Sequence, residues 1–354
     1  MYDVNAHLHT PYSFSAFSSI DEALDHALKE RVKVVGINDF YSMEGYGAWN
    51  AGCMLRGLFP LFGIEFISLN EEDQAAGLRV NDPNNPGRTY ISGKGLSFPV
   101  MLRGEPLRQL EAVKAEANAQ VERMCDKLND WLKAKGYDLV LDFDEIKEKY
   151  TKGSIRERHL AKALRLALER CPVRAGHDVN LDLIGDPATI ENKLRSKLLK
   201  AGGPAFVPER PEAFLPMKTV QGIIEAAGGI PTYPFLGDDA KGNFTDFEAD
   251  LQQAADTLKK RGFRSAEFIT TRNTTAVLEQ YAGYLEDEGF IVTFGSEHNT
   301  PAMEPVRLRT RDASELSDKL KAINWRGACA VAAHQVGLDS VEAGEEVIQD
   351  YIDL

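Results

Sequence analysis

The sequence contains few cysteines, and none of them is paired at a spacing that suggests chemistry. Its 354 residues include four cysteines, Cys53, Cys125, Cys171 and Cys329, and no two of them form a Cys-x-x-Cys motif. This spacing excludes a zinc knuckle and a dithiol redox motif. Such sparse use of cysteine suits a reducing cytosol.

Long hydrophobic runs are also lacking. No stretch of 18 consecutive apolar residues occurs, so we expect no membrane-spanning helix and no membrane partner. The N-terminal sequence MYDVNAHLHT has neither the basic segment nor the apolar run of a secretory signal. We therefore expect a cytoplasmic location.

Positive charge is in deficit. The chain carries 41 Lys and Arg against 54 Asp and Glu, a formal net charge of −13 at pH 7. An acidic surface repels phosphate backbones, so this balance disfavours non-specific binding to nucleic acid. A local basic pocket for a small anion remains compatible with it, and we expect a small, anionic substrate. Nothing in the sequence specifies an oligomeric state.

Short apolar runs alternate with helical patterns along most of the chain. A first strand ends near His7, and five further runs are short and almost continuously apolar, as strands covered on both faces must be. These runs span residues 32–37, 61–67, 229–233, 263–269 and 290–295. Repeated strand–helix–strand alternation predicts an α/β fold with a parallel sheet.

Three helical patterns in the middle of the chain interrupt this alternation. The longest, residues 106–135, has apolar residues at every third or fourth position, and the others begin near Ser154 and at Asp186. They predict an inserted helical subdomain at 104–212, which leaves 1–103 and 213–300 for the barrel and 301–354 for a C-terminal extension that packs on it. Residues 70–99 are polar and rich in Gly and Pro, which indicates a long loop or a small hairpin.

The candidate metal ligands stand at the ends of predicted strands. His7 and His9 alternate along the first strand, so both imidazoles lie on one face. Glu65 ends the third strand, and Glu297 with His298 follows the last one. Because the carboxyl ends of parallel barrel strands meet at one face, these groups form a nitrogen and oxygen ligand set suited to Mn, Fe or Zn. Taken one by one, they are also compatible with surface histidines, a paired buried carboxylate and a polar loop.

Other polar residues have less specific patterns. Asp39 follows the second strand, where it is either a ligand, an acceptor for a ligating histidine, or a turn residue. Arg158 and His159 stand near a helix start and could face an anion, whereas Arg156 fits a solvated helix face better. His26, His177 and His334 have no partner pattern, and we interpret them as structural.

Eight segments in a fixed order resemble the PHP (polymerase and histidinol phosphatase) family of metal-dependent phosphoesterases. They are HLHT, GINDF, GIEF, the long helix, RERHLAKAL, GGPAFVP, AAGGIPTYPF and TFGSEHN, and they span about residues 1 to 300. The resemblance implies a distorted seven-stranded β/α barrel with a helical insertion. It also implies that His7 and His9 are the leading metal ligands, Glu65 is the bridging carboxylate, Glu297 replaces an Asp, and His159 faces the substrate phosphate.

Several positions depart from the family pattern. Phe14 stands where the family has Asp, and Phe40, Tyr233 and Asn299 stand where it has His. Phenylalanine cannot bind a metal and tyrosine is a poor substitute for histidine at neutral pH. We therefore expect one divalent ion, or two if Asp39, His159 or His298 also bind.

Three functions fit these patterns, and we rank a metal-dependent hydrolase of phosphate esters first. In this reaction a metal-activated water would attack the phosphate ester. His159, His298 or Asp39 would serve as catalytic groups, and Arg158 would hold the anion. The second function is a metal-dependent conversion of a sugar or sugar acid, with an aromatic lining that includes Phe40 and Tyr233. The third is a non-catalytic, ligand-binding domain.

Overall fold

A barrel-shaped sheet of seven strands forms the centre of the protein. The computed structural model describes residues 1–170, 184–300 and 303–353, so His177 and Cys171 lie outside the described part. The strands follow the order β1-β2-β3-β4-β6-β7-β8. They are β1 (Asp3–Leu8), β2 (Val32–Phe40), β3 (Phe59–Leu69), β4 (Arg88–Lys94), β6 (Ile230–Phe235), β7 (Ser265–Ile269) and β8 (Ile291–Gly295), and the short β5 (Leu215–Pro216) pairs with β3.

The sheet nearly closes between β1 and the segment after β8. The backbone N–H of His9 donates to the carbonyl of Glu297 (2.8 Å), and the Glu297 N–H donates to the carbonyl of His7 (3.0 Å). These bonds set the first and last strands side by side, which confirms the predicted distorted seven-stranded α/β barrel.

One strand runs against the others. The strand β4 pairs antiparallel with β3 and with β6, whereas the remaining pairs of the barrel are parallel. The expectation of a uniformly parallel sheet is therefore wrong at β4, which lies within the segment interpreted as a loop or hairpin. The chain returns from β3 through the short helix α3 (Glu71–Ala75) and not through a long crossover helix. In β4, polar residues that face inward alternate with apolar ones, so a search for apolar runs does not detect this strand.

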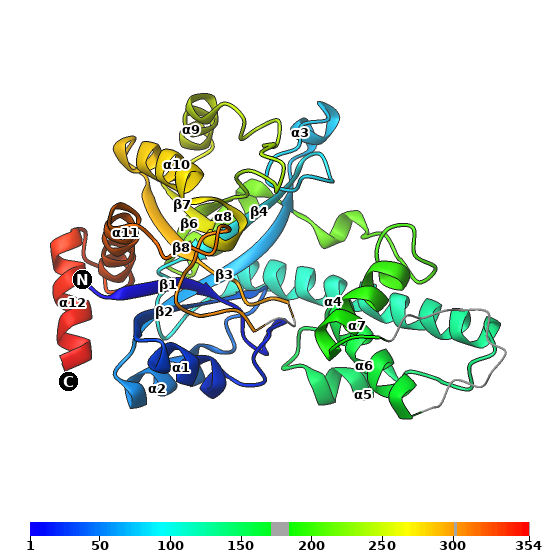
Figure 1. Cartoon of the computed structure of the whole chain (residues 1–354). Coiled ribbons are helices and arrows are strands. Elements are labelled where there is room, and N and C mark those ends of the chain that lie inside the picture. The colour runs from blue at the N-terminus through cyan, green and yellow to red at the C-terminus, as the bar shows by residue number, and fades with distance from the viewer. Residues whose placement is uncertain (171–183, 301–302, 354) are drawn as a thin grey trace.

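Helices cover the outside of the barrel (Figure 1). Several of these helices have a capping residue whose side chain accepts a backbone N–H of the first turn. Examples are Ser19 for α1, Asp250 for α9 and Thr274 for α10. The covering helices are α1 (Ile20–Lys29), α2 (Tyr46–Arg56), α8 (Met217–Ala226), α9 (Leu251–Lys260) and α10 (Thr275–Asp287), with the 3₁₀ turns η2 (Pro211–Ala213) and η3 (Thr270–Arg272) between them.

The helices between β4 and β5 gather at one side of the barrel (Figure 1). The long helix α4 (Gly104–Ala134) places Leu110 and Val113 in the core of the barrel and Val121 and Leu128 in a second, separate core. That second core is shared with α5 (Phe143–Tyr150), α6 (Glu157–Arg170), α7 (Pro187–Leu194) and the π-helical turn η1 (Arg195–Leu199). One helix thus ties the inserted helices to the barrel.

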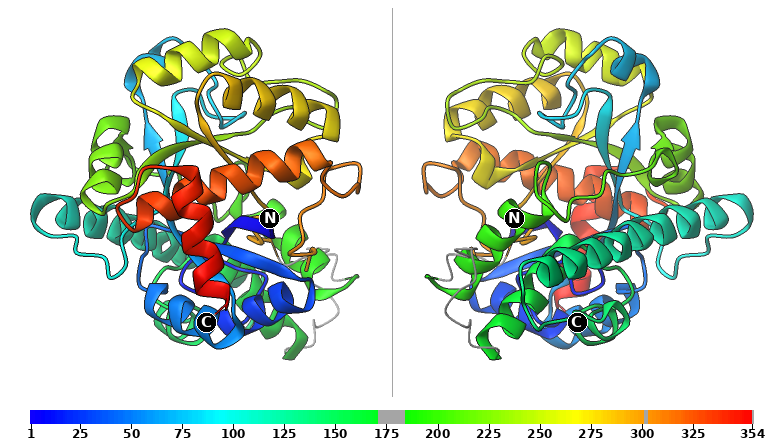
Figure 2. Two further views of the ribbon diagram at one scale, coloured as in Figure 1. Left: turned by 90° about the vertical axis from the view of Figure 1, so that its left-hand side faces the viewer. Right: turned by 90° about the vertical axis from the view of Figure 1, so that its right-hand side faces the viewer.

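The last two helices lie on the opposite side of the barrel from the inserted ones (Figures 1 and 2). Trp325 of α11 (Asp318–Gln335) and Ile348 of α12 (Val341–Asp353) share a hydrophobic cluster with Val4 of β1 and Phe59 of β3. In the described part of the chain, no helix is both long and apolar enough to cross a membrane.

Candidate metal centre

Two imidazoles at the carboxyl end of β1 converge with a carboxylate from within β3. This strand continues past Glu65 to Leu69 and does not end there as the sequence suggested. The Nε2 atoms of His7 and His9 lie 3.4 Å apart, and the Glu65 Oε2 atom lies 3.7 Å and 3.3 Å from them. Ligands bonded to one transition-metal ion at about 2.1 Å have about these mutual separations. Among the described residues, these three form the group whose ligand atoms all lie within 4.8 Å of one another.

The other ring nitrogen of each histidine is fixed by an acceptor. Nδ1 of His7 donates to Glu267 Oε2 (3.0 Å), because a carboxylate can only accept. Nδ1 of His9 donates to Ser13 Oγ (3.2 Å), since that hydroxyl itself donates to Asp39 Oδ1 (2.6 Å). A neutral imidazole at either position would therefore carry its lone pair on Nε2, the nitrogen nearest Glu65, which is how metal-binding histidines are normally oriented.

Glu65 carries an oxygen that no donor satisfies. Its side chain is buried, and Oε2 has no hydrogen-bond partner among the described residues. Burial opposes ionisation of this carboxyl, but the adjacent imidazoles of His7 and His9 lower its pKa to about 2. A charged, buried, unsatisfied oxygen beside two oriented imidazoles fits a divalent cation.

Close packing at His7 explains the glycine at the end of β8. A Cβ atom at Gly295 would lie 2.2 Å from the Cβ atom of His7, a distance that real side chains do not reach. Any other residue there would displace the imidazole from Glu65. The glycine in the segment TFGSEHN is thus a structural requirement of the centre.

Glu267 and Lys94 belong to the centre and were not found from the sequence. Glu267 lies inside β7, and its contacts with His7 and Lys94 place its carboxylate inside the barrel. Burial raises the pKa of this carboxyl, but Lys94 and His7 reverse the effect and hold it well below its usual range. Burial lowers the pKa of His7, yet the Glu267 carboxylate raises it to about 9. A lone Glu within the apolar run FRSAEFI is the one signal that could have revealed it.

Asp39 accepts hydrogen bonds from two residues close to His9. Its Oδ1 accepts from the Thr10 N–H (2.7 Å) and the Ser13 hydroxyl, and its Oδ2 accepts from the Thr10 hydroxyl. Burial raises the pKa of Asp39, and these donors oppose that rise. Of the alternatives that the sequence left open, the geometry places Asp39 as the acceptor that orients His9 through Ser13.

Glu297 lies outside the group of three. Both of its carboxylate oxygens accept from Arg272 Nη2 (2.8 and 2.9 Å), and Oε2 also accepts from the Asn299 amide (2.8 Å). The backbone of Glu297 and His298 adopts left-handed angles, φ 62° and 56°, which are uncommon for residues with a side chain. This turn closes the barrel against β1 while Glu297 pairs with Arg272 at the pocket.

His298 and His159 have engaged ring nitrogens. His298 contacts Ser296 Oγ at Nδ1 (2.8 Å) and the Glu304 carbonyl at Nε2 (2.8 Å). His159 accepts the backbone N–H of Arg156 at Nδ1 (2.9 Å), so it caps the start of α6. Burial lowers the pKa of both histidines, that of His159 to about 3.

The remaining predicted residues fall into two groups. Phe40 and Arg158 line the same cavity as Glu65, whereas Tyr233 is fully buried and donates to Glu248 (2.9 Å) within an aromatic core. The interpretation of Tyr233 as a substrate contact therefore needs correction, because strand alternation turns its side chain outward from the barrel. His26 lies beside Glu30, and His334 contacts the Gly228 carbonyl, away from the centre.

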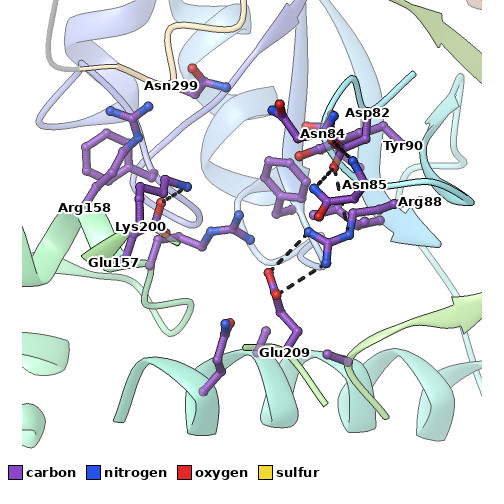
Figure 3. Close-up of a pocket in the computed structure, with 18 of the residues that line it drawn as sticks. Asp82, Asn84, Asn85, Arg88, Tyr90, Glu157, Arg158, Lys200, Glu209 and Asn299 are labelled. Carbon is purple, nitrogen blue, oxygen red and sulfur yellow. Dashed lines mark hydrogen bonds and ion pairs between the residues drawn. The ribbon is translucent and has the colours of Figure 1, made fainter. Parts of the chain in front are cut away.

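A cavity of about 400 Å³ connects the centre with the inserted helices. Glu65 lies at the barrel end of this cavity, and α6 and η1 supply its opposite wall. Figure 3 shows two sides, one with Glu157, Arg158 and Lys200, the other with Asp82, Asn84, Asn85, Arg88 and Tyr90.

Two guanidinium groups in this cavity lack a carboxylate partner among the described residues. The Arg156 guanidinium lies 4.6 Å from the centre of the Phe40 ring, and that of Arg158 lies 5.4 Å from Phe14 and donates to the Asn192 amide oxygen (3.2 Å). Other cations of the cavity are paired, for example Arg88 with Glu209. Arg156 is therefore not on a solvated face, contrary to our interpretation of its position in the sequence.

Solved structures of similar fold support this architecture. A candidate metal-dependent phosphoesterase from Bifidobacterium adolescentis superposes with a TM-score of 0.61 and 16% identity, covering 90% of this chain and 94% of that one. An amidohydrolase from Chromobacterium violaceum, solved with sulfate and without metal, gives 0.59 and 16% identity, with 91% and 96% covered. No protein-family model and no curated protein matches the sequence. The chain is thus similar in fold to a candidate metal-dependent phosphoesterase and to an amidohydrolase, and its buried His-His-Glu group fits a metal ion.

Proposed function

We propose that the protein is a metal-dependent hydrolase of phosphate esters of small molecules. The observation that carries the proposal is the convergence of His7 and His9 on an oxygen of Glu65, beside a cavity with two guanidinium groups. Among the described residues, that oxygen has no hydrogen-bond partner and neither guanidinium group has a carboxylate partner. The phosphoesterase and amidohydrolase of similar fold favour hydrolysis as the reaction class.

The metal would be held by His7, His9 and Glu65. Two neutral imidazoles and one carboxylate suit Mn, Fe or Zn, and the three ligands leave positions open for water and substrate. Such an ion supplies a Lewis acid that activates water and polarises the phosphoryl group. Glu267 and Ser13 hold the two imidazoles in the orientation that this role requires.

Arg156 and Arg158 would bind the phosphate. Guanidinium groups pair with phosphate through parallel hydrogen bonds, and these two are not committed to a carboxylate of the described chain. Both come from the start of α6 or the residues before it, so the inserted helices would contribute the anion-binding side of the site. We assign no proton transfer to His159 or His298, because the contacts of their ring nitrogens serve the local structure.

Conversion of a sugar or sugar acid is the second candidate. The side of the cavity that carries Asp82, Asn84 and Asn85 offers carboxylate and amide groups, which bind hydroxyl groups well. Phe40 and Tyr90 supply apolar faces beside them. This candidate requires turnover of a substrate that has no phosphate.

A hydrolysis screen tests the proposal. Purified protein is loaded with Mn, Fe or Zn and assayed on phosphomonoesters and phosphodiesters, on amides, and on sugar acids. We expect metal-dependent release of phosphate that is lost in His9→Ala and kept in His26→Ala, a histidine outside the centre. Metal binding without turnover of any substrate would instead favour a non-catalytic, ligand-binding role.

A further inference from the structure

Lys94 is buried inside the barrel with its ammonium group surrounded by oxygen atoms. The residue is 2% exposed, and Nζ lies 2.7 Å from Glu267 Oε2, 3.0 Å from the Ala6 carbonyl and 3.1 Å from Asn38 Oδ1. The three acceptors belong to β7, β1 and β2. They use all three donors of the ammonium group, so the position is a complete cation site.

Both oxygens of the carboxylate that faces Lys94, that of Glu267, accept from donors of the chain. Glu267 Oε2 receives both the ammonium group and Nδ1 of His7, and Oε1 accepts from the Ser92 hydroxyl. Glu65 differs, because its Oε2 atom has no donor among the described residues. Two buried carboxylates therefore flank the imidazole of His7. Glu267 is paired with the Lys94 ammonium group, whereas Glu65 is available to a cation.

The backbone around Lys94 is shaped to admit these oxygens. Gly63 is the β3 residue that pairs with Lys94, and a Cβ atom there would lie 2.3 Å from Asn38 Oδ1. The amide of Asn38 can face the ammonium group only because that position carries no side chain. Gly63, Asn38 and Glu267, from three strands, thus form the surroundings that the Lys94 ammonium group requires.

We propose that the Lys94 ammonium group permanently occupies a cation position beside the metal centre and limits the centre to one divalent ion. The inference depends on the proposed metal site. A second divalent ion near Glu267 would have to displace a tethered ammonium group from three oxygens or lie beside its positive charge. Lys94 also holds Glu267 in contact with His7 Nδ1, which leaves His7 Nε2 as the ligand atom.

Metal stoichiometry tests this inference. Equilibrium dialysis against Mn(II) chloride, followed by elemental analysis, should give one ion per wild-type chain and two per Lys94→Ala chain. The double variant Lys94→Met, Glu267→Gln is the matched control, because it removes both charges and fills the position with an apolar chain. We expect it to bind one ion. Two ions on the wild type or on the double variant, or one ion on Lys94→Ala, would overturn the inference.

A second measurement keeps the inference testable if Lys94→Ala is unstable. Ammonium ions should enter the emptied position, so the melting temperature of Lys94→Ala should rise in ammonium chloride relative to sodium chloride at equal concentration. The wild type should show no such difference. A variant that stays equally unstable, or unfolded, in both salts contradicts the inference.

These outcomes are separable from those that concern hydrolysis. The ammonium experiment uses no divalent metal and no substrate, so it reports on the Lys94 position alone. A wild type that binds one ion and hydrolyses phosphate esters, together with a Lys94→Ala chain that also binds one, defeats the inference and leaves the proposed function intact. A wild type that binds no divalent ion defeats the proposed function.

Discussion

The ring of Phe40 lies parallel to the imidazole of His9, with centroids 5.3 Å apart and an interplanar angle of 5°. Arg156, from the inserted helical segment, places its guanidinium group 4.6 Å from the centre of the same Phe40 ring. A side chain of the insertion therefore contacts the wall of the candidate metal centre through one aromatic ring. Phe40 thus contacts both a candidate metal ligand and one of the two guanidinium groups that we propose bind the anion.

Arg156→Met should weaken substrate use without affecting metal binding. Loss of a charge-assisted hydrogen bond to phosphate is expected to lower kcat/KM by about 10- to 100-fold. Steady-state hydrolysis of a phosphate ester and metal content measured on the same sample check this. Arg108→Met, on the exposed face of α4, is the matched control and should behave as the wild type. Equal losses in both variants would argue against a phosphate role for Arg156.

Glu297→Gln should leave the affinity for a divalent ion within about threefold of the wild-type value. The reason is that its carboxylate pairs with Arg272 and Asn299 and lies outside the group of three ligands. Glu65→Gln should instead lower the affinity by about 10-fold or more, because it removes the charged ligand. Mn(II) titration calorimetry on both variants measures the difference. A loss in Glu297→Gln as large as that in Glu65→Gln would restore Glu297 to the ligand set.

His159 should make the fold sensitive to acid. Burial, with a smaller effect of Lys162, lowers its pKa to about 3 in the folded chain, against about 6.5 when unfolded. Between these values the unfolded chain binds more protons, so stability rises with pH through this window, is complete above about pH 6.5, and is lost as the pH falls.

His159→Asn is the variant that checks this dependence. Asparagine keeps an acceptor for the Arg156 N–H but does not titrate in this range. Urea unfolding at pH 5 and pH 7 should show a smaller loss of stability on acidification than in the wild type or in His26→Asn. Metal-dependent turnover at pH 7 should be retained. An unchanged pH dependence combined with lost turnover would instead assign His159 to catalysis.

The sequence was sufficient to predict the barrel, and three of the four ligands predicted from it, His7, His9 and Glu65, form one group in the structure, whereas Glu297 lies outside that group. His7 and His9 stand out because a two-residue period on a strand directs both to one face, and Glu65 is the one charged residue in a clearly apolar run. The common edge of the parallel strands then brings the three together. These predictions depend on local periodicity and on one topological rule.

The parts that escaped prediction depend on contacts between distant segments. Glu267 is a single polar residue inside an apolar strand, and only its neighbours His7 and Lys94 reveal its role. Lys94 lies on β4, whose polar alternation resembles a loop. Arg156 was interpreted as solvated, because the sequence cannot show that the inserted helices turn its side chain towards Phe40.

Anomalous diffraction from a crystal grown with Mn(II) tests the central claim most directly. The account predicts one strong peak per chain, about 2.1 Å from Nε2 of His7, Nε2 of His9 and Oε2 of Glu65. The peak should be absent in His9→Ala crystals grown in the same way. A wild-type crystal with no peak at these atoms, or with its peak at Glu297 and Asn299, would contradict the account.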